Sequence, residues 1–407
     1  MRRRDFLLGG ACLTTLTGCG MSLEQGVFNC CRPTAPIDKE TAELVRAAWD
    51  GLHADRVWDT HTHLFGNGLG ETGVWENPTK SLKTRIQRVL YVNASCGGGD
   101  NAGLDAGMVT RLAHLASELK DGAKVMVLAF DDTYDAATHK KIDGQTVFSV
   151  SNEYAARKAS ENKKRFEWIA SIHPYRTDAL DELAKAKANG ARAVKWLPSV
   201  MGIDFRNEQT RRFFEEMKRL DMPLLTHVGE ERALDGAGRH EFNNPLLLRI
   251  PLGLGVRVIG AHCASLGESD DLDANFNPKG GKKEDFELFS QLMGDHQYDD
   301  LLFGDLSAVT QSNRVKNLSR IIIEKGDWHH RLLNGSDYPL PGVMPIFSLS
   351  AYVKADFLKE GEAKLLRELR QANSLLFDFV LKRTIQHQGK KLPNAAFETR
   401  SFFDRSA

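Results

Sequence analysis

The chain has 407 residues, enough for one large domain with insertions or for two domains. A hydrophobic content of 42% and a charged content of 27% are typical of a soluble globular enzyme. Because 54 basic and 54 acidic residues give a formal net charge of zero, the overall charge makes no case for nucleic acid as a partner, and the substrate must be inferred from local motifs.

Residues 1–19 predict an export signal. The basic cluster Arg2–Arg4 contains a twin arginine, and the apolar stretch that follows is too short to span a bilayer. The sequence LTGC at Leu16–Cys19 then resembles a bacterial lipobox, in which the cysteine carries the lipid. We expect a twin-arginine and lipoprotein-type signal, with Cys19 lipidated and the protein held on the periplasmic side of a bacterial membrane by its lipid anchor only. The alternative is an ordinary basic N-terminus with a chance cysteine.

Residues 20–38 are rich in turn-forming and polar side chains and predict a linker, so residues 39–407 would form the folded domain. Beyond the lipobox, the cysteines are Cys30, Cys31, Cys96 and Cys263. No C-x-x-C pair occurs in the sequence, which argues against a zinc ribbon. An oxidising compartment would permit a disulfide among these cysteines, but their spacing selects none.

From Arg56 onward, apolar runs alternate with helical stretches, as expected for parallel strands that are buried on both faces. The eight predicted strands are Val57–His61, Lys124–Phe130, Glu167–His173, Ala191–Leu197, Pro223–His227, Arg257–His262, Leu301–Leu306 and Arg331–Asn334. Val89–Ala94 competes with Lys124–Phe130 for the second place. Eight strand and helix units over roughly 280 residues predict an α/β fold, a (β/α)8 TIM barrel.

Helices are predicted around and between these strands. They are Lys39–Leu52, Met108–Leu119, Asn152–Asn162, Ala179–Ala188, Glu208–Leu220, Asn244–Leu252 and Arg314–Lys325. Two long insertions, Leu64–Asp121 and Asp131–Lys164, follow strands one and two. They should therefore leave the active-site face of the barrel and shape the substrate pocket. Ser265–Asp285 is polar and predicts a mobile loop after strand six.

Metal-ligand side chains stand at the ends of four predicted strands. His61 and His63 are two residues apart, and residues i and i+2 of a strand face the same side. His227, His262 and Asp337 follow strands five, six and eight. Each could be structural on its own, but their places in the strand order bring all of them to one mouth of the barrel, which predicts a divalent metal site.

These motifs together resemble the amidohydrolase superfamily, and within it the amidohydrolase-related (amidohydrolase 2) branch of metal-dependent hydrolases and decarboxylases. The resemblance runs from about Arg56 to Asp378. The motifs that carry it are DTHTH at Asp59–His63, IASIHP at Ile169–Pro174, GARAVKWLP at Gly190–Pro198, PLLTHVG at Pro223–Gly229, GAHC at Gly260–Cys263 and NGSDYP at Asn334–Pro339.

The resemblance implies roles for these positions. The metal ligands would be His61, His63, His227 and Asp337, around one divalent ion that is most simply Zn²⁺. His262, together with Asp337, would move protons beside the water at the metal. Imidazole and carboxylate ligands suit zinc, and an unperturbed histidine pKa of about 6.5 suits proton transfer at neutral pH.

Lys195, at the fourth strand, is open to two interpretations. In two-metal members of the superfamily, a carbamylated lysine at this strand bridges two ions. The alternative is a cation that pairs with a carboxylate or holds an anionic substrate. His173 could be part of the pocket wall or of a turn, and Asp305 could hydrogen-bond a ligand histidine. One of Glu230, Glu231 and Arg232 could reach the substrate.

Three functions fit these residues. The first is hydrolysis, in which water activated by the metal attacks an ester, lactone or amide carbon of a small organic molecule. The second is metal-dependent, non-oxidative decarboxylation of a carboxylic acid on the same ligands. The third is a non-catalytic metal-binding or ligand-binding protein. The sequence does not identify the substrate or the oligomeric state.

Overall fold

The structure is a computed structural model that describes residues 36–70, 72–78, 82–95, 103–142, 144–234, 238–273, 281–343 and 346–405. The predicted signal at 1–19, with Cys19, and nearly all of the predicted linker lie outside these residues, as do Cys30, Cys31 and Cys96. Cys263 is the one cysteine in the described ranges, and it is a buried free thiol. No helix within the described ranges is long and apolar enough to cross a bilayer.

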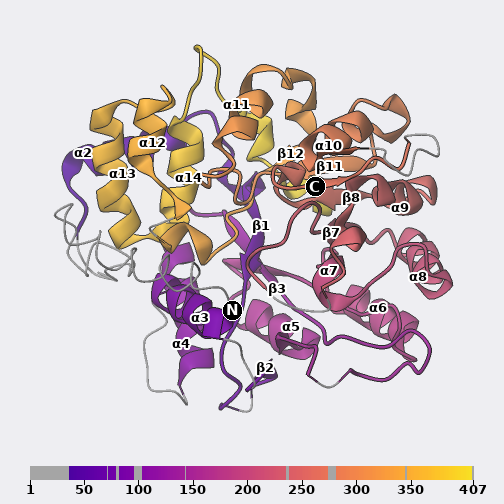
Figure 1. The fold of residues 1–407 in the computed structure, drawn as a ribbon. Helices are drawn as coiled ribbons and strands as arrows, with labels where there is room; N and C mark the ends of the chain where they lie inside the picture. The colour runs from indigo at the N-terminus through magenta and orange to yellow at the C-terminus, as the bar shows by residue number, and fades with distance from the viewer. Residues whose placement is uncertain are drawn as a thin grey trace.

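Eight parallel strands form the centre of the molecule, and helices surround them (Figure 1). They are β1 (Trp58–His63), β3 (Lys124–Leu128), β5 (Phe166–Ile169), β6 (Val194–Trp196), β7 (Leu224–Thr226), β8 (Val258–Gly260), β11 (Leu302–Asp305) and β12 (Leu332–Leu333). Each overlaps one predicted run, so the TIM barrel is confirmed. Val89–Ala94 is not a strand but lies within the helix α3 (Leu82–Ser95), which corrects that alternative.

The strands belong to two sheets, in the orders β1-β3-β5 and β12-β11-β8-β7-β6. Single parallel bridges join the sheets at both edges, between Ala170 and Val194 and between Thr62 and Tyr338. At the second edge, Thr60 N also donates to Asn334 O at 3.0 Å. The barrel is therefore closed, and the carboxyl ends of all eight strands surround one mouth.

The two long insertions, which follow β1 and β3, pair with each other. The first holds β2 (Val74–Glu76), α3 and α4 (Leu104–Ser117), and the second holds β4 (Phe148–Val150) and α5 (Asn152–Glu161). β2 and β4 pair in antiparallel register, with Val74 opposite Val150. Two segments separated by a barrel strand in sequence are thus joined into one wall above the mouth.

The predicted outer helices are present with small shifts of their ends. They are α2 (Lys39–Ala48), α6 (Ala179–Ala188), α8 (Glu208–Arg219), α9 (Arg249–Gly253) after a short 3₁₀ turn at Pro245–Leu248, and α11 (Val315–Ile323). Two of these helices, α2 and α8, start after side-chain caps: Asp38 accepts from Thr41 N at 2.7 Å, and Asn207 accepts from Gln209 N at 2.8 Å. In α8 the apolar side chains Phe213, Phe214 and Met217 are buried, as the helical period requires.

The segment Ser265–Asp285 differs from the predicted loop. Among its described residues, β9 (Glu268–Asp270) and β10 (Lys282–Glu284) form an antiparallel hairpin, and α10 (Asp285–Met293) follows directly. The hairpin could not be predicted from this charged and glycine-rich sequence. Its strands are largely exposed and lack the apolar alternation that marks a half-buried strand.

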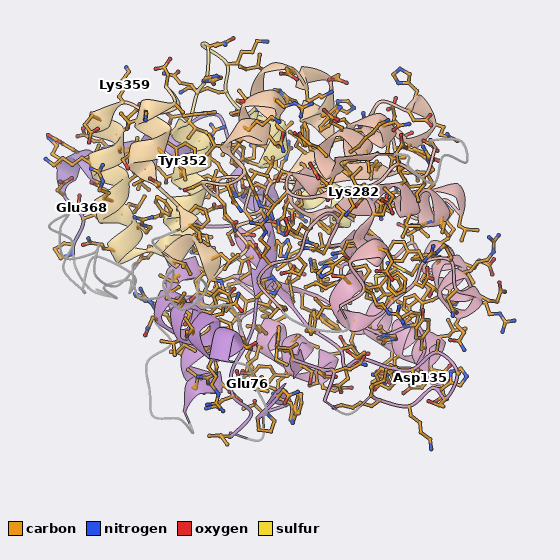
Figure 2. All side chains as sticks on the ribbon, in the orientation of Figure 1. Glu76, Asp135, Lys282, Tyr352, Lys359 and Glu368 are labelled. Atoms are coloured by element: carbon orange, nitrogen blue, oxygen red, sulfur yellow. The ribbon has the colours of Figure 1, made fainter. Side chains whose placement is uncertain are left out.

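The chain after β12 adds helices that the sequence interpretation did not assign. These are α12 (Leu349–Lys354), α13 (Glu360–Ala372), α14 (Ser374–Thr384) and the short α15 (Arg400–Phe403). In Figure 1, α12, α13 and α14 gather with α2 on one side of the barrel. Glu368, labelled at the outer edge in Figure 2, accepts from Asp38 N at 2.8 Å and so links α13 to α2.

The interior of the barrel is a small apolar core of its own. Side chains from seven strands and their ends fill it, with Trp58, Met126, Leu128, Ile169, Ala193, Leu225, Ile259, Ala261 and Leu333 in one cluster. Phe402 and Phe403 of α15 belong to the same cluster. The N-terminal end of the barrel is therefore closed by the last helix, and the opposite end carries the polar side chains.

Candidate metal centre

β1 brings two histidines into the barrel mouth. Because side chains alternate along a strand, His61 and His63 face the same side, and their ring centroids lie 5.0 Å apart. His61 is 1% exposed, whereas the His63 side chain is 24% exposed toward the opening. The pair therefore extends from the buried floor of the site to its open side.

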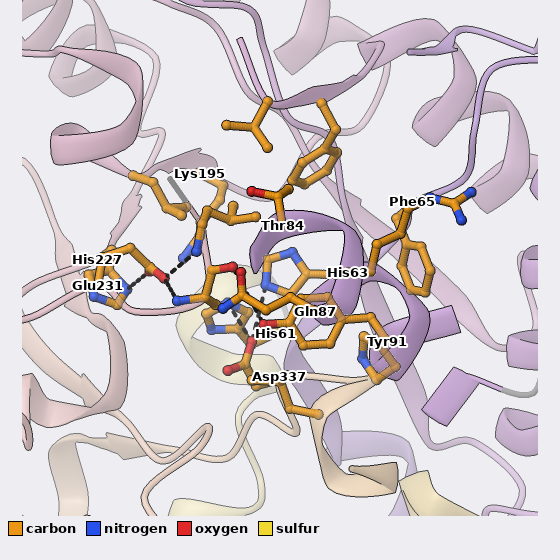
Figure 3. A pocket seen from close by; sticks show the side chains of 18 of the residues that line it. His61, His63, Phe65, Thr84, Gln87, Tyr91, Lys195, His227, Glu231 and Asp337 are labelled. Atoms are coloured by element: carbon orange, nitrogen blue, oxygen red, sulfur yellow. Dashed lines mark hydrogen bonds and ion pairs between the residues drawn. The ribbon is translucent and has the colours of Figure 1, made fainter. Parts of the chain in front are cut away.

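Asp337 reaches the same point from the loop after β12. Its Oδ1 lies 3.1 Å from His63 Nε2 and 3.5 Å from His61 Nε2. The ligand atoms of these three residues lie within 4.8 Å of one another, and Figure 3 shows them together. Two imidazole nitrogens and a carboxylate oxygen that converge in a buried pocket fit a divalent metal ion.

The backbone of Asp337 is held in a conformation that L residues rarely adopt, with φ of 58°. Asp337 N donates to His61 O at 2.8 Å, which ties the loop to β1. The preceding Gly335 has no room for a side chain, since a Cβ there would lie 2.7 Å from His61 Cβ and 2.8 Å from Thr60 Oγ1. The NGSD sequence thus lets the loop pack directly on β1 and deliver the carboxylate.

The charges of the cluster are coupled. Burial by itself would raise the pKa of Asp337, but the charges of His61, His63 and His262 outweigh it and hold that pKa well below its usual range. Burial, with the nearby Lys195 ammonium, lowers the pKa of His61 to about 4. An ionised carboxylate beside a neutral imidazole is the state that binds a metal ion.

Asp305 and Ser307 determine which nitrogen of His61 faces the site. Asp305 Oδ2 can only accept while ionised, and it lies 2.7 Å from His61 Nδ1. His61 Nδ1 therefore carries the proton, and Nε2 offers its lone pair toward Asp337. Ser307 Oγ donates to Asp305 Oδ2 and lies 3.0 Å from His61 Nδ1. Such carboxylate contacts orient metal-binding histidines.

His262 is held in the same tautomer as His61. Its Nδ1 lies 2.9 Å from Ser307 O, a carbonyl that only accepts, so Nδ1 carries the proton. Its Nε2 is then an acceptor, and it lies 4.0 Å from Asp337 Oδ2. Burial lowers the pKa of His262 well below its ordinary value, so the ring is neutral at pH 7. The backbone of His262 also has a positive φ of 58°.

His227 lines the same pocket but stands apart from the cluster of His61, His63 and Asp337. Its Nδ1 lies 3.3 Å from Glu231 Oε2, and its Nε2 lies 3.3 Å from Glu230 O. Both ring nitrogens thus contact the loop that follows β7, and the ring centroid is 5.1 Å from that of His262. Metal binding through His227 would need its Nε2 to turn from the Glu230 carbonyl.

The side chains of His61, His63 and Asp337 form one end of a pocket of about 950 Å³, a volume that includes open solvent at its mouth. One face of α3, the helix inserted after β1, lines it with Thr84, Gln87, Arg88 and Tyr91 at helical spacing. The remaining wall is mainly apolar and comes from the start of β4 and several loops: Phe65, Val147, Phe148, Leu197, Leu234, Pro339 and Leu340. A small organic molecule with an apolar body fits this lining.

A sequence model of the amidohydrolase family matches residues 58–360, which is most of the chain and includes every residue of the cluster. The chain belongs to the amidohydrolase family. This amidohydrolase is therefore an enzyme, which corrects the alternative of a non-catalytic binding protein. The family depends on metal, and the His and Asp cluster of the chain suits one.

Solved structures that resemble this amidohydrolase are distant. One is a probable 2-pyrone-4,6-dicarboxylic acid hydrolase from Acinetobacter baumannii with citric acid bound, with 15% identity, 74% of this chain and 91% of the other covered, and a TM-score of 0.44. Another is a 2,6-dihydroxybenzoate decarboxylase from Rhizobium, with 12% identity, 79% and 98% covered, and a TM-score of 0.40. At such low sequence identity, these matches do not indicate which reaction the protein catalyses. No curated protein sequence matches the chain.

Lys195 lies at the barrel mouth of this amidohydrolase and lines the pocket. It is 1% exposed, and burial lowers the pKa of its ammonium group to about 8, although the charges of Asp337, Asp305 and Glu231 act in the opposite direction. The lysine thus keeps a positive charge in the pocket that is easily lost.

The structure shows which of the remaining candidate residues line the pocket. His173 is part of a turn: its Nδ1 accepts from Tyr175 N at 3.2 Å, its Nε2 donates to Met201 O at 3.0 Å, and it does not line the pocket. Glu231 lines the pocket beside His227, whereas Glu230 and Arg232 pair with each other at 2.6 Å on the outer side of that loop. Of the three charged residues after His227, only Glu231 reaches the site.

Several functional positions were missed from the sequence. Ser307 could have been found as the residue two after Asp305, on the same side of the strand end. The polar face of α3 could have been found from the helical spacing of Thr84, Gln87, Arg88 and Tyr91. Neither signal shows by itself that the residues lie at the barrel mouth.

Proposed function

We propose that this amidohydrolase is a metal-dependent hydrolase that acts on an ester, lactone or amide bond of a small organic molecule. The observation that carries the proposal is the placement of His262 Nε2, an acceptor, 4.0 Å from Asp337 in the cluster with His61 and His63. A metal-binding group and a proton acceptor then face one apolar pocket, as hydrolysis requires.

His61, His63 and Asp337 would hold the ion, with His227 as a fourth ligand after its ring has turned. We propose zinc, because nitrogen and carboxylate ligands suit it. When bound, the ion would act as a Lewis acid on the substrate carbonyl and lower the pKa of a water molecule to about 7. A second ion would require carbamylation of Lys195, so the metal content per chain distinguishes one ion from two.

The residues of the chain would supply proton transfer and positioning. His262 accepts the proton of the attacking water at Nε2 and returns it to the leaving group, with Asp337 as the neighbouring carboxylate. Because Ser307 O accepts from His262 Nδ1, the protonated ring stays oriented in the same direction. Lys195 would hold a negatively charged group of the substrate or the charge that develops on the carbonyl oxygen.

Decarboxylation is the second candidate, and Lys195 is the observation that favours it. A buried ammonium beside a dication site suits a substrate carboxylate, which carries the opposite charge. In that reaction the carbon–carbon bond breaks, carbon dioxide leaves with no net consumption of water, and a proton from the solvent, passed on by His262 or Asp337, is added to the remaining carbon. Detection of carbon dioxide from an aromatic or unsaturated acid would favour it over hydrolysis.

The test combines metal analysis with a screen of lactones, amides and aromatic acids. The double variant His61→Ala/His63→Ala should lose the bound metal and all turnover of whichever substrate is found, and a chelator should abolish turnover by the wild type. Full metal content and full activity in the double variant would show that the site lies elsewhere. His173→Gln serves as the control, because His173 lies outside the pocket.

Export and lipidation are a separate proposal that rests on the sequence motifs of residues 1–19. The Cys19→Ser variant should move from the membrane fraction to the soluble fraction of the periplasm, and the wild type should incorporate labelled palmitate. A wild-type protein that stays unlabelled and distributes like Cys19→Ser would contradict the anchor.

A further inference from the structure

A buried ion pair lies behind the loop that carries Asp337. Lys382 and Asp378 stand one turn apart on α14, and both are fully buried. Lys382 Nζ donates to Asp378 Oδ2 at 2.6 Å and to Gly335 O at 2.6 Å. A charged group of the buried helix α14 therefore contacts the backbone of the loop two residues before Asp337.

The loop is held from two sides. On the barrel side, Asp59 Oδ1 accepts from Ser336 N at 2.9 Å and from His61 N at 3.0 Å, and Asp337 N donates to His61 O. On the helix side, the contact is the bond from Lys382 to Gly335 O. Because Gly335 packs against β1 without space for a side chain, a shift of its carbonyl moves the whole turn relative to His61.

The pair is poorly suited to a role in stability alone. Asp378 Oδ1 has no hydrogen-bond partner in the described structure, and buried pairs of this kind are often replaced by apolar residues without loss of stability. The bond to the loop is different, because it holds Gly335, two residues before Asp337, whose φ of 58° must be maintained by its surroundings.

We propose that Lys382 is a positioning residue of the metal centre, which fixes the carboxylate of Asp337 against His61 and His63 by anchoring Gly335 O. The proposal rests on the metal site of the proposed function. Loss of the anchor would leave every ligand present but loosen one of them, and contacts of this kind change metal affinity by about 10- to 100-fold.

Three variants separate this role from stability. Asp378→Asn keeps an oxygen near Lys382 and keeps the bond to Gly335 O, so it is the matched control. Lys382→Met removes the anchor but leaves Asp378 alone in the interior. Asp378→Leu/Lys382→Met replaces the pair with apolar side chains and should restore the melting temperature that Lys382→Met loses.

The experiment measures three quantities on each purified full-length protein: the melting temperature, the dissociation constant for Zn²⁺ by competition with a chromogenic chelator, and the hydrogen exchange of the peptide that contains Asp337 in the metal-free state. The expected result is that Lys382→Met and Asp378→Leu/Lys382→Met both bind Zn²⁺ about 10- to 100-fold more weakly and exchange faster at this peptide. Asp378→Asn should behave as the wild type does.

Three results would overturn the proposal. If Asp378→Leu/Lys382→Met folds and binds Zn²⁺ as tightly as the wild type, Lys382 does not position Asp337, and the proposed hydrolase still stands. If the wild type itself binds no metal at His61 and His63, both proposals fail together. Weak binding by Asp378→Asn as well would assign the effect to the ion pair and not to the Gly335 contact.

Discussion

His262 and Asp337 occupy the left-handed region of the backbone, which L residues other than Asn and Asp rarely adopt, and each position costs on the order of 1–3 kcal/mol. Both face the same pocket, and each donates a hydrogen bond to a carbonyl at a neighbouring strand end: His262 Nδ1 to Ser307 O and Asp337 N to His61 O. The strain lies where the chemistry is proposed, because it directs His262 Nε2 and the Asp337 carboxylate toward each other. At the residue scale, the proposed chemistry therefore depends on where His262 Nε2 and the Asp337 carboxylate oxygens lie.

Replacement of His262 tests its role in proton transfer. His262→Gln should lower kcat by about 10²- to 10⁴-fold, the usual contribution of a general base, while the metal content stays at the wild-type value. Single-turnover rates and elemental analysis of the same sample check this. Equal loss of metal and activity would instead make His262 a ligand.

His173 provides a pH-dependent contribution to stability. Burial lowers its pKa to about 4 in the folded protein, against 6.5 for the free side chain. Because the unfolded chain binds the proton more readily, this contribution is present above pH 6.5 and is lost as the pH falls toward 4, by about 3 kcal/mol in total. His173→Gln should be less stable at pH 7 but should lose less stability between pH 6.5 and 4. Parallel curves for both proteins in urea denaturation would exclude this role.

At the scale of secondary-structure elements, α3 provides a wall of the pocket at the barrel mouth. Its inner face lines the pocket, and it is fixed at two points: Gln87 Nε2 donates to Arg232 O at 3.1 Å, and Tyr338 OH donates to Ser95 O at 2.7 Å. Its outer face carries the exposed Ile86 and Val89. Substrate selection is therefore expected to depend on α3 and the reaction on the strand ends.

Arg88 is the charged side chain of this face, and Glu76 of β2 holds it through Nε at 2.7 Å. For a substrate with an acidic group away from the metal, Arg88→Met should raise KM about tenfold, the effect of one lost hydrogen bond, with kcat and metal content unchanged. Arg85→Met, on the exposed face of the same helix, is the matched control. An equal effect of both variants would show that α3 responds as a whole.

At the scale of the whole molecule, the end of the chain closes the barrel opposite the site. Phe402 and Phe403 pack in the interior cluster, and Arg257 of the barrel lies over the Phe402 ring at 4.7 Å. The chemistry and the closure thus lie at opposite ends of one set of strands, so stability and activity should separate.

Phe402→Ala should lower the free energy of unfolding by about 3 kcal/mol, as loss of a buried aromatic side chain does, and should leave the Zn²⁺ dissociation constant unchanged. Ser401→Ala, an exposed neighbour, is the control. Urea unfolding and metal titration on both variants check the prediction. A Zn²⁺ affinity that falls together with stability would indicate coupling along the strands.

The sequence by itself determined the strand order of the barrel and the candidates His61, His63, His227, His262 and Asp337, because parallel strands have a distinct apolar pattern and their carboxyl ends meet at one mouth. It could not determine which of those side chains converge. The tertiary structure grouped His61 and His63 with Asp337 and left His227 against Glu231. It also brought Ser307, α3 and Lys382 to the site, because these contacts join residues far apart in the chain and no local period records them.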